Sequence, residues 1–212
     1  YWKFISKIFS LMNYSMNHIA FLYTMVGPMG SGIDGGLYRT VCLWSRFLIK
    51  KGHTVTIIAP QGSLFPKGVH GIEISGDLQP SCQLDGYSHE TSECLIHACN
   101  TVMDHHEQFD VIINMAYDMA PHERLRHLDT PVFHYISMCH LHDVFTQFLI
   151  KHQRVDRPYG FLTSSQRESF MGLNASYCQL FKQPFDINAS TFYEHHTTKD
   201  IAWMGRISPE KG

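Results

Sequence analysis

The chain has 212 residues, of which 44% are hydrophobic and 17% charged, with 17 basic and 19 acidic side chains. The hydrophobic fraction and low net charge exclude wholesale disorder, and the charge balance lacks the basic excess of a protein that binds nucleic acid phosphates. The longest apolar run, around 19–26, is shorter than the roughly 18–20 residues that span a bilayer. We therefore expect a cytoplasmic, globular protein with no transmembrane segment and no nucleic acid partner.

Cysteine and histidine are the residues most able to hold a metal here. The six cysteines include no CxxC pair, which a zinc ribbon would need. Among the fifteen histidines are three close pairs, at 105–106, 140 and 142, and 195–196. None of these pairs has the i, i+4 spacing and the third ligand of a helical metal site. We therefore expect free, mainly buried thiols, and no metal or cofactor.

Apolar runs alternate with segments of helical periodicity from residue 18 onward. Residues 37–51 carry Leu37, Val41 and Leu48 at helical spacing, and Gly52 after two lysines is a helix stop. The expected strands are 19–26, 54–59, 72–75, 110–115, 132–137, 161–163 and 177–181, and the expected helices are 37–51, 88–108 with Ser88 as cap and Glu90 in the first turn, 121–128, 141–151 and 164–171. Short connections in this order predict an α/β fold with a doubly wound, parallel, Rossmann-like sheet.

The first loop of such a sheet, GPMGSGIDGG over 27–36, is rich in glycine. Gly30, Gly32 and Gly35 match the spacing of a dinucleotide-binding fingerprint, and backbone N–H groups at a helix start favour anions. However, the loop is long, and the second strand ends in Pro60-Gln61 without the acid that would bind a ribose hydroxyl. Gly35 and Gly36, at the helix start, are then the more informative pair.

The second notable stretch is GRISPEKG, residues 205–212. Arg206 closes a strand-like segment, and Lys211 precedes a glycine near the expected start of a helix. Two cations in this arrangement suit a diphosphate, because arginine can bind it through two hydrogen bonds and lysine acts as a point charge. From composition alone, a solvated charged loop would be the better interpretation of this stretch.

The two stretches together resemble family 4 glycosyltransferases, which are two-domain enzymes of the GT-B fold. GRISPEKG is similar to the G-R-x-x-x-x-K-G signature that opens their second domain, and GGLYRTVCLWSRFLIKKGHTVTIIAP looks like the glycine loop, helix and strand of their first domain. The resemblance spans about 17–212. It implies a retaining, metal-independent transfer of a hexose, glucose by expectation, from a nucleotide sugar such as UDP-glucose to a small hydroxylated acceptor.

The resemblance also assigns site residues. Arg206 and Lys211 would neutralise the donor diphosphate as it leaves, which makes them the expected catalytic residues. Gly35 and Gly36 would pass close to the donor phosphates or the transferred sugar. The Asn-Gly that the family has near its domain junction is replaced here by Gln183-Pro184.

Three further residues are the main candidates for binding the acceptor, and two more could lie beside it. Asp118 follows the strand 110–115 and could hydrogen-bond a ligand hydroxyl or a pterin amine, although a helix cap explains it equally well. Asp34 in the glycine loop could contact the acceptor or shape a turn. His134 lies within a strand, whereas the family's histidine follows it, so a core histidine is as good an interpretation. Tyr117 and Met138 could flank a flat acceptor or simply pack.

The domain expectation follows from the same segments. Residues 1–16 would be a leader of doubtful relevance, 17–183 an acceptor-side domain, 184–199 a linker, and 200–212 the first strand and loop of a donor-binding domain that is cut short. Such a fragment is expected to show no transfer by itself. Two alternatives remain open, an NAD(P)-dependent oxidoreductase and a non-catalytic ligand-binding module, and a homodimer is as open as a monomer.

Overall fold

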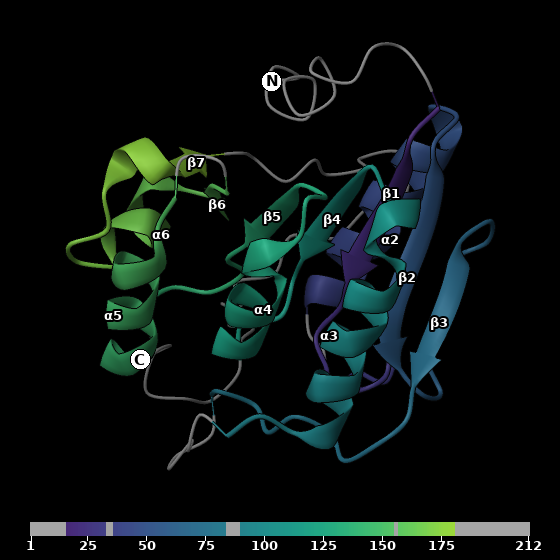
Figure 1. The fold of residues 1–212 in the computed structure, drawn as a ribbon, viewed down its shortest axis with the longest axis horizontal. Coiled ribbons are helices and arrows are strands. Elements are labelled where there is room, and N and C mark those ends of the chain that lie inside the picture. Colours follow the sequence, from purple (N-terminus) through teal and green to yellow (C-terminus); the bar gives the residue numbers. More distant parts are fainter. Residues whose placement is uncertain (1–15, 33–35, 84–89, 155–156, 181–212) are drawn as a thin grey trace, which may run out of the picture.

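A computed structural model describes residues 16–32, 36–83, 90–154 and 157–180 (Figure 1). Seven parallel strands form one sheet in the order β3-β2-β1-β4-β5-β6-β7, with helices between them. This confirms the predicted doubly wound α/β fold. The strands are β1 (His18–Leu22), β2 (Thr54–Pro60), β3 (His70–Ile74), β4 (Val111–Asn114), β5 (Val132–Tyr135), β6 (Tyr159–Phe161) and β7 (Cys178–Leu180).

The main helices alternate with these strands along the chain. They are α2 (Gly36–Lys50), α3 (Glu93–His105), α4 (Met119–Arg124), α5 (Asp143–His152) and α6 (Ser164–Glu168), with short 3₁₀ turns at His106–Gln108, Leu125–His127 and Ala175–Tyr177. Among the described residues, no helix combines the length and the apolar character needed to cross a membrane.

Strand β1 is the third strand of the sheet and the point where the order of the strands reverses direction. Ile19 pairs with Val55 of β2 on one side and with Val111 of β4 on the other. The chain first builds outward through β2 and β3, then returns past α3 to place β4 against the free edge of β1. The crevice between the carboxyl ends of β1 and β4 is therefore the topological switch point.

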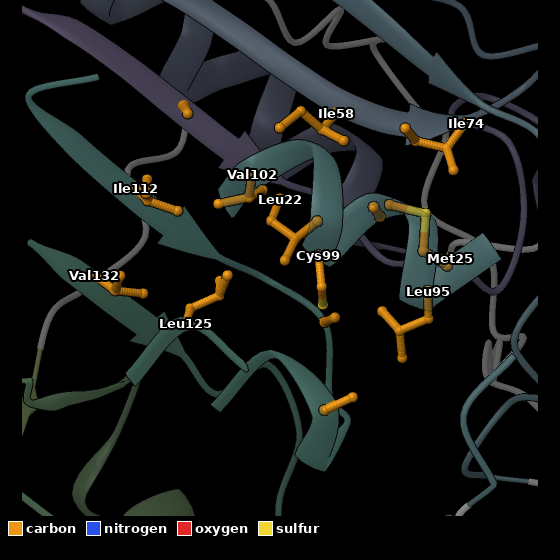
Figure 2. Close-up of a cluster of buried hydrophobic side chains, with 14 of the residues drawn as sticks. Leu22, Met25, Ile58, Ile74, Leu95, Cys99, Val102, Ile112, Leu125 and Val132 are labelled. Carbon is orange, nitrogen blue, oxygen red and sulfur yellow. The ribbon is translucent and has the colours of Figure 1, made fainter. Parts of the chain in front are cut away.

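Alternating side chains of β1, β2 and β4 belong to two separate hydrophobic clusters, one on each face of the sheet. Ile19 and Phe21 point to the face that α2 covers, where they pack with Val41 and Trp44. Ala20 and Leu22 point to the opposite face and pack under α3. This second group, here called the α3-side cluster, includes Leu22, Met25, Ile58, Leu95, Cys99, Val102 and Ile112, drawn in Figure 2. Figure 1 shows α3 and α4 in front of the strands.

The end of α2 follows the expected pattern. Gly52 has a φ of +89°, a left-handed conformation that favours glycine. Its N–H donates to the carbonyl of Ile49 at 2.9 Å, and the N–H of His53 donates to that of Leu48 at 3.1 Å. This pair of bonds is a Schellman motif, so the predicted helix stop is confirmed.

Several boundaries differ from the prediction by a few residues, and two of these differences matter most for the switch-point edge and for α3. Strand β1 ends at Leu22 instead of Val26, although Tyr23 and Met25 remain fully buried. The Tyr23 N–H still donates to the Ile58 carbonyl of β2 at 2.9 Å, and after it the apolar run continues as a packed loop. Helix α3 begins at Glu93, and its cap is Ser92 rather than Ser88: the Ser92 side chain accepts from the Leu95 N–H at 3.2 Å. The acid in the first turn is accordingly Glu93, not Glu90.

Candidate functional site

The loops that follow the central strands all leave from the carboxyl edge of the sheet. Residues 23–32 follow β1, residues 115–118 follow β4 and residues 136–142 follow β5. Ligands of doubly wound sheets bind at this edge, in the crevice at the switch point. The candidate site is therefore the edge formed by these three loops and the start of α2.

The loop after β1 is held from the side of β2. The Met29 N–H donates to the Ser63 hydroxyl at 2.9 Å, and the Leu64 N–H donates to the Met29 carbonyl at 3.0 Å. Beyond this anchor the backbone is exposed, and Gly30 and Gly32 adopt φ values of +80° and +87°. The two positions need glycine for conformational reasons, whatever the loop binds.

Gly36 is the first residue of α2 and is exposed. A Cβ built at this position would meet nothing within 4 Å, so packing does not require the glycine. That leaves room for a ligand next to the backbone at the start of a 15-residue helix. Gly35 and Asp34 lie outside the described residues, as do Arg206 and Lys211.

The loop after β4 is folded around the Asn114 side chain, which is fully buried. Its Oδ1 accepts the Ala116 N–H at 3.1 Å, and its Nδ2 donates to Nδ1 of His134 at 3.1 Å. Tyr117 continues the loop and donates its hydroxyl to the carbonyl of Cys139 at 3.2 Å, which ties this loop to the one after β5. No sequence pattern sets Asn114 apart from the rest of this strand.

Asp118 ends this loop at the cap position of α4, and its side chain is 6% exposed. The backbone there is extended as in a cap, but the carboxylate makes no capping hydrogen bond to the helix. Its negative charge adds to burial in raising the pKa of the Cys82 thiol to about 12. Asp118 therefore lies at the switch-point edge, near the buried Cys82, and acts on its surroundings through charge.

His134 is a buried residue of β5, 4% exposed, next to Asn114 across the ladder. Its ring stacks on that of His122 from α4, with centroids 3.9 Å apart and planes 16° apart. Burial lowers the pKa of His134 well below its ordinary value, and the neighbouring His122 and Arg157 lower it further. His134, His122 and Asn114 are here called the histidine group.

His122 is a second residue of this site that the sequence patterns did not identify. Its two ring nitrogens are buried without a hydrogen-bond partner among the described residues. The walls around it are aromatic, with Phe145, Phe148 and Tyr159 at centroid distances of 5.8, 5.9 and 5.7 Å. The sequence feature that could have indicated a buried His122 is its position among Ala120, Pro121 and Leu125. All three are buried, in α4 and in the turn after it.

Two buried glutamines brace the loops of the edge. Gln166 in α6 donates to the carbonyls of Ile136 and Met138, at 2.7 and 3.0 Å, and so fixes the loop after β5. Gln79 donates its backbone N–H to the Met25 carbonyl at 2.9 Å, and its Oε1 accepts from Ser92 at 2.8 Å. Their roles depend on contacts between distant segments, so periodicity could not reveal them.

All six cysteines are free, and Cys42, Cys82, Cys94 and Cys99 are buried. The prediction of mainly buried thiols is therefore confirmed, with Cys139 as the exposed exception. Over the described ranges, no group of three or more His, Cys, Asp or Glu side chains could hold a metal ion.

The chain was compared with protein families, curated proteins and solved structures. No family model and no curated protein matches it. Among solved structures, it is similar to a UDP-glucose: anthocyanidin 3-O-glucosyltransferase in complex with UDP, at 14% identity and a TM-score of 0.36, over 58% of this chain and 31% of that one. It is also similar to the structure of trehalose-6-phosphate from E. coli bound with UDP-2-fluoro glucose, at 10% identity and a TM-score of 0.40. This match covers 74% of this chain and 42% of that one. The chain thus spans less than half the length of either protein.

Proposed function

We propose that this chain is the acceptor-side part of a retaining glycosyltransferase of the family 4 type. The enzyme would move a hexose, glucose in the first instance, from UDP-glucose to a small hydroxylated acceptor. The observation that carries the proposal is the strand order, which brings the glycine loop, the start of α2 and the loop containing Asp118 to one switch-point crevice. The motif GRISPEKG supplies the two cations that such a reaction needs.

The proposed roles follow from where charge develops. Glycosyl transfer from a nucleotide sugar leaves a diphosphate, and groups aimed at that charge stabilise the transition state more than the ground state. We assign this role to Arg206 and Lys211. Gly35 and Gly36 would let the donor approach the backbone at the start of α2, where the helix dipole favours an anion.

For the acceptor we propose a pterin, with tetrahydrobiopterin as the first compound to test. The support is a resemblance of three segments, GPMGSG, 114–118 and 131–138, to UDP-glucose:tetrahydrobiopterin glucosyltransferase. Asp118 would accept hydrogen bonds from a pterin amine or an acceptor hydroxyl, with Asp34 and His134 as secondary candidates. No metal is assigned a role in this proposal.

The residues at the end of β2 weigh against an NAD(P)-dependent oxidoreductase. The strand ends at Pro60, followed by Gln61, where a dinucleotide site would place an acid. An acid close by, Glu73 of β3, already accepts the Gly62 N–H at 2.7 Å. The glycine spacing is then left without the ribose-binding partner that makes it a dinucleotide fingerprint.

The proposal is tested with the full-length protein, UDP-glucose and tetrahydrobiopterin. Arg206→Ala and Lys211→Ala are each expected to lower kcat/KM by about 10²–10³, because each removes a charge that the leaving diphosphate uses. Arg46→Ala on the exposed side of α2 and Lys67→Ala in the exposed loop after β2 are the matched controls, with unchanged rates expected. Full activity in both site variants, or tight NAD(P) binding without any response to UDP, would refute the proposal.

A further inference from the structure

The Asn114 side chain connects the loop after β4 to the stacked histidines, and its hydrogen bonds can be read in one direction only. The Ala116 backbone N–H can only donate, so the amide oxygen of Asn114 must face it, as the 3.1 Å contact has it. The amide nitrogen then faces Nδ1 of His134 at 3.1 Å and donates to it. Nδ1 is therefore an acceptor, and the ring proton of neutral His134 sits on Nε2.

Within the described part of the chain, no negatively charged group acts on either histidine of the pair. His122 stacks on His134, and Phe145, Phe148 and Tyr159 form the walls around them. Among the described residues, the charged or titratable groups that face the pair are His152 of α5 and Arg157, which both disfavour a positive charge, and Tyr159 of β6, whose hydroxyl donates to the Leu149 carbonyl. Both histidines are thus held neutral.

Protonating Nδ1 of His134 cannot be accommodated by rotating one side chain. A protonated Nδ1 is a donor that would face the donor amide of Asn114. Flipping the Asn114 amide would satisfy His134 but would then point the amide nitrogen at the Ala116 N–H, again donor against donor. Either arrangement breaks one of two Asn114 bonds, the one from the Ala116 N–H or the one to His134, while the longer bond from the Asn114 amide nitrogen to the Ala116 carbonyl, 3.4 Å, persists only in the unflipped arrangement.

We propose that Asn114 and His134 are positioning residues that lock segment 115–118 at the switch-point edge while His134 is neutral, and release it when His134 is protonated. The proposal rests on the proposed function only for the site's location, and its test uses no substrate. Since segment 115–118 includes Asp118, release would displace a group that we assign to the acceptor.

The test measures amide hydrogen exchange in the full-length protein between pH 7.5 and 5.5, with protection corrected for the intrinsic exchange rate. The reference is the Ile112 N–H of β4, which donates to the Pro131 carbonyl at 2.9 Å, lies outside the released segment and does not depend on the Asn114 side chain. Protection of Ala116 relative to Ile112 is expected to fall with pH, by up to about tenfold per pH unit once the released form binds the proton. A constant ratio over this range would overturn the proposal.

Asn114→Asp is the sharpest variant. A carboxylate keeps an acceptor for the Ala116 N–H and offers a second acceptor to a protonated His134, so the pH dependence of Ala116 protection is expected to vanish. The exposed His105→Gln is the control, with the wild-type dependence retained. An Asn114→Asp protein with the wild-type dependence would contradict the proposal.

A measurement on the wild-type protein covers the case in which that variant does not fold. Side-chain ¹H–¹⁵N spectra at pH 6 are expected to show His134 neutral, with the proton on Nε2 and Nδ1 accepting a hydrogen bond. A charged ring, or a proton on Nδ1, would refute the lock.

Discussion

The α3-side cluster and the histidine group lie side by side on one face of the sheet, but they are stabilised differently. The cluster over β1, β2 and β4 is apolar, with Leu22, Ile58 and Val102 fully buried (Figure 2). The histidine group over β4 and β5 buries two imidazoles and an amide in the same kind of environment. Burial of apolar surface does not depend on pH, whereas the neutral histidines must not take up a proton. On one face of the sheet, the contribution of the α3-side cluster to stability is therefore independent of pH, and that of the histidine group is lost in acid.

The largest effect is expected in the apolar part. Leu22→Ala deletes a fully buried side chain from the α3-side cluster and should lower the free energy of unfolding by about 2–5 kcal/mol. Urea unfolding at pH 7.5 and 5.5 should give the same loss at both values. Leu64→Ala, at a position 63% exposed, is the control and should stay within about 0.5 kcal/mol of wild type. If the loss of unfolding free energy in Leu22→Ala grew as the pH fell, the α3-side cluster would not be the pH-independent region.

A smaller effect is expected from His122, one of the three residues of the histidine group. Burial lowers the pKa of His122 to about 3, so it binds its proton more readily in the unfolded chain than in the folded one. Its contribution to stability is therefore complete above pH 6.5 and is lost as the pH falls toward 3, reaching about 2 kcal/mol of loss at pH 5. His122→Phe should remove this part of the pH dependence while keeping the ring stack.

The comparison for this variant is unfolding free energy at pH 7.5 against pH 5. Wild type should lose about 2 kcal/mol more than His122→Phe over this interval. His70→Gln, at an exposed position of the edge strand β3, should keep the wild-type difference. Equal losses in wild type and His122→Phe would show that His122 is not held neutral.

The smallest effect concerns the helix that covers the apolar part. Ser92→Ala removes the side chain that accepts the Leu95 N–H at the start of α3, at an expected cost of about 1 kcal/mol in unfolding free energy at either pH. Ser165→Ala, which alters an exposed serine of α6 that caps no helix, is the matched control. Equal stability of the two variants would mean that the cap contributes nothing to how α3 holds the cluster.

The alternation of strands and helices could be predicted because each buried strand leaves a continuous apolar run and each covering helix leaves a periodic one. The same signal misplaced the end of β1, since Tyr23 and Met25 are as buried as the strand itself. It also placed the cap of α3 wrongly, at Ser88 instead of Ser92, because the position of Ser92 depends on Gln79, which accepts the Ser92 N–H from thirteen residues away.

The candidate site was predictable as a location and less so as a set of side chains. Asp118 and the glycine loop were found because they follow strands whose carboxyl ends meet at one edge. His122 and Asn114 were missed because their importance lies in a stack and a ladder neighbour, His134, which only the sheet register brings to them. The roles of Arg206, Lys211, Gly35 and Asp34 stay predictions, since these residues lie outside the described ranges.

The position of β1 between β2 and β4 also bears on how the chain folds during synthesis. Strand β2 ends at Pro60 and β4 begins at Val111, so one edge of β1 stays unpaired while about 50 further residues are made. At roughly 5–20 residues per second this takes about 3–10 s. An open, apolar strand edge is a template for wrong pairing. The hazardous stage for this chain is therefore the interval before β4 leaves the ribosome, when β1, α2 and β2 can already form a local unit with one side uncovered.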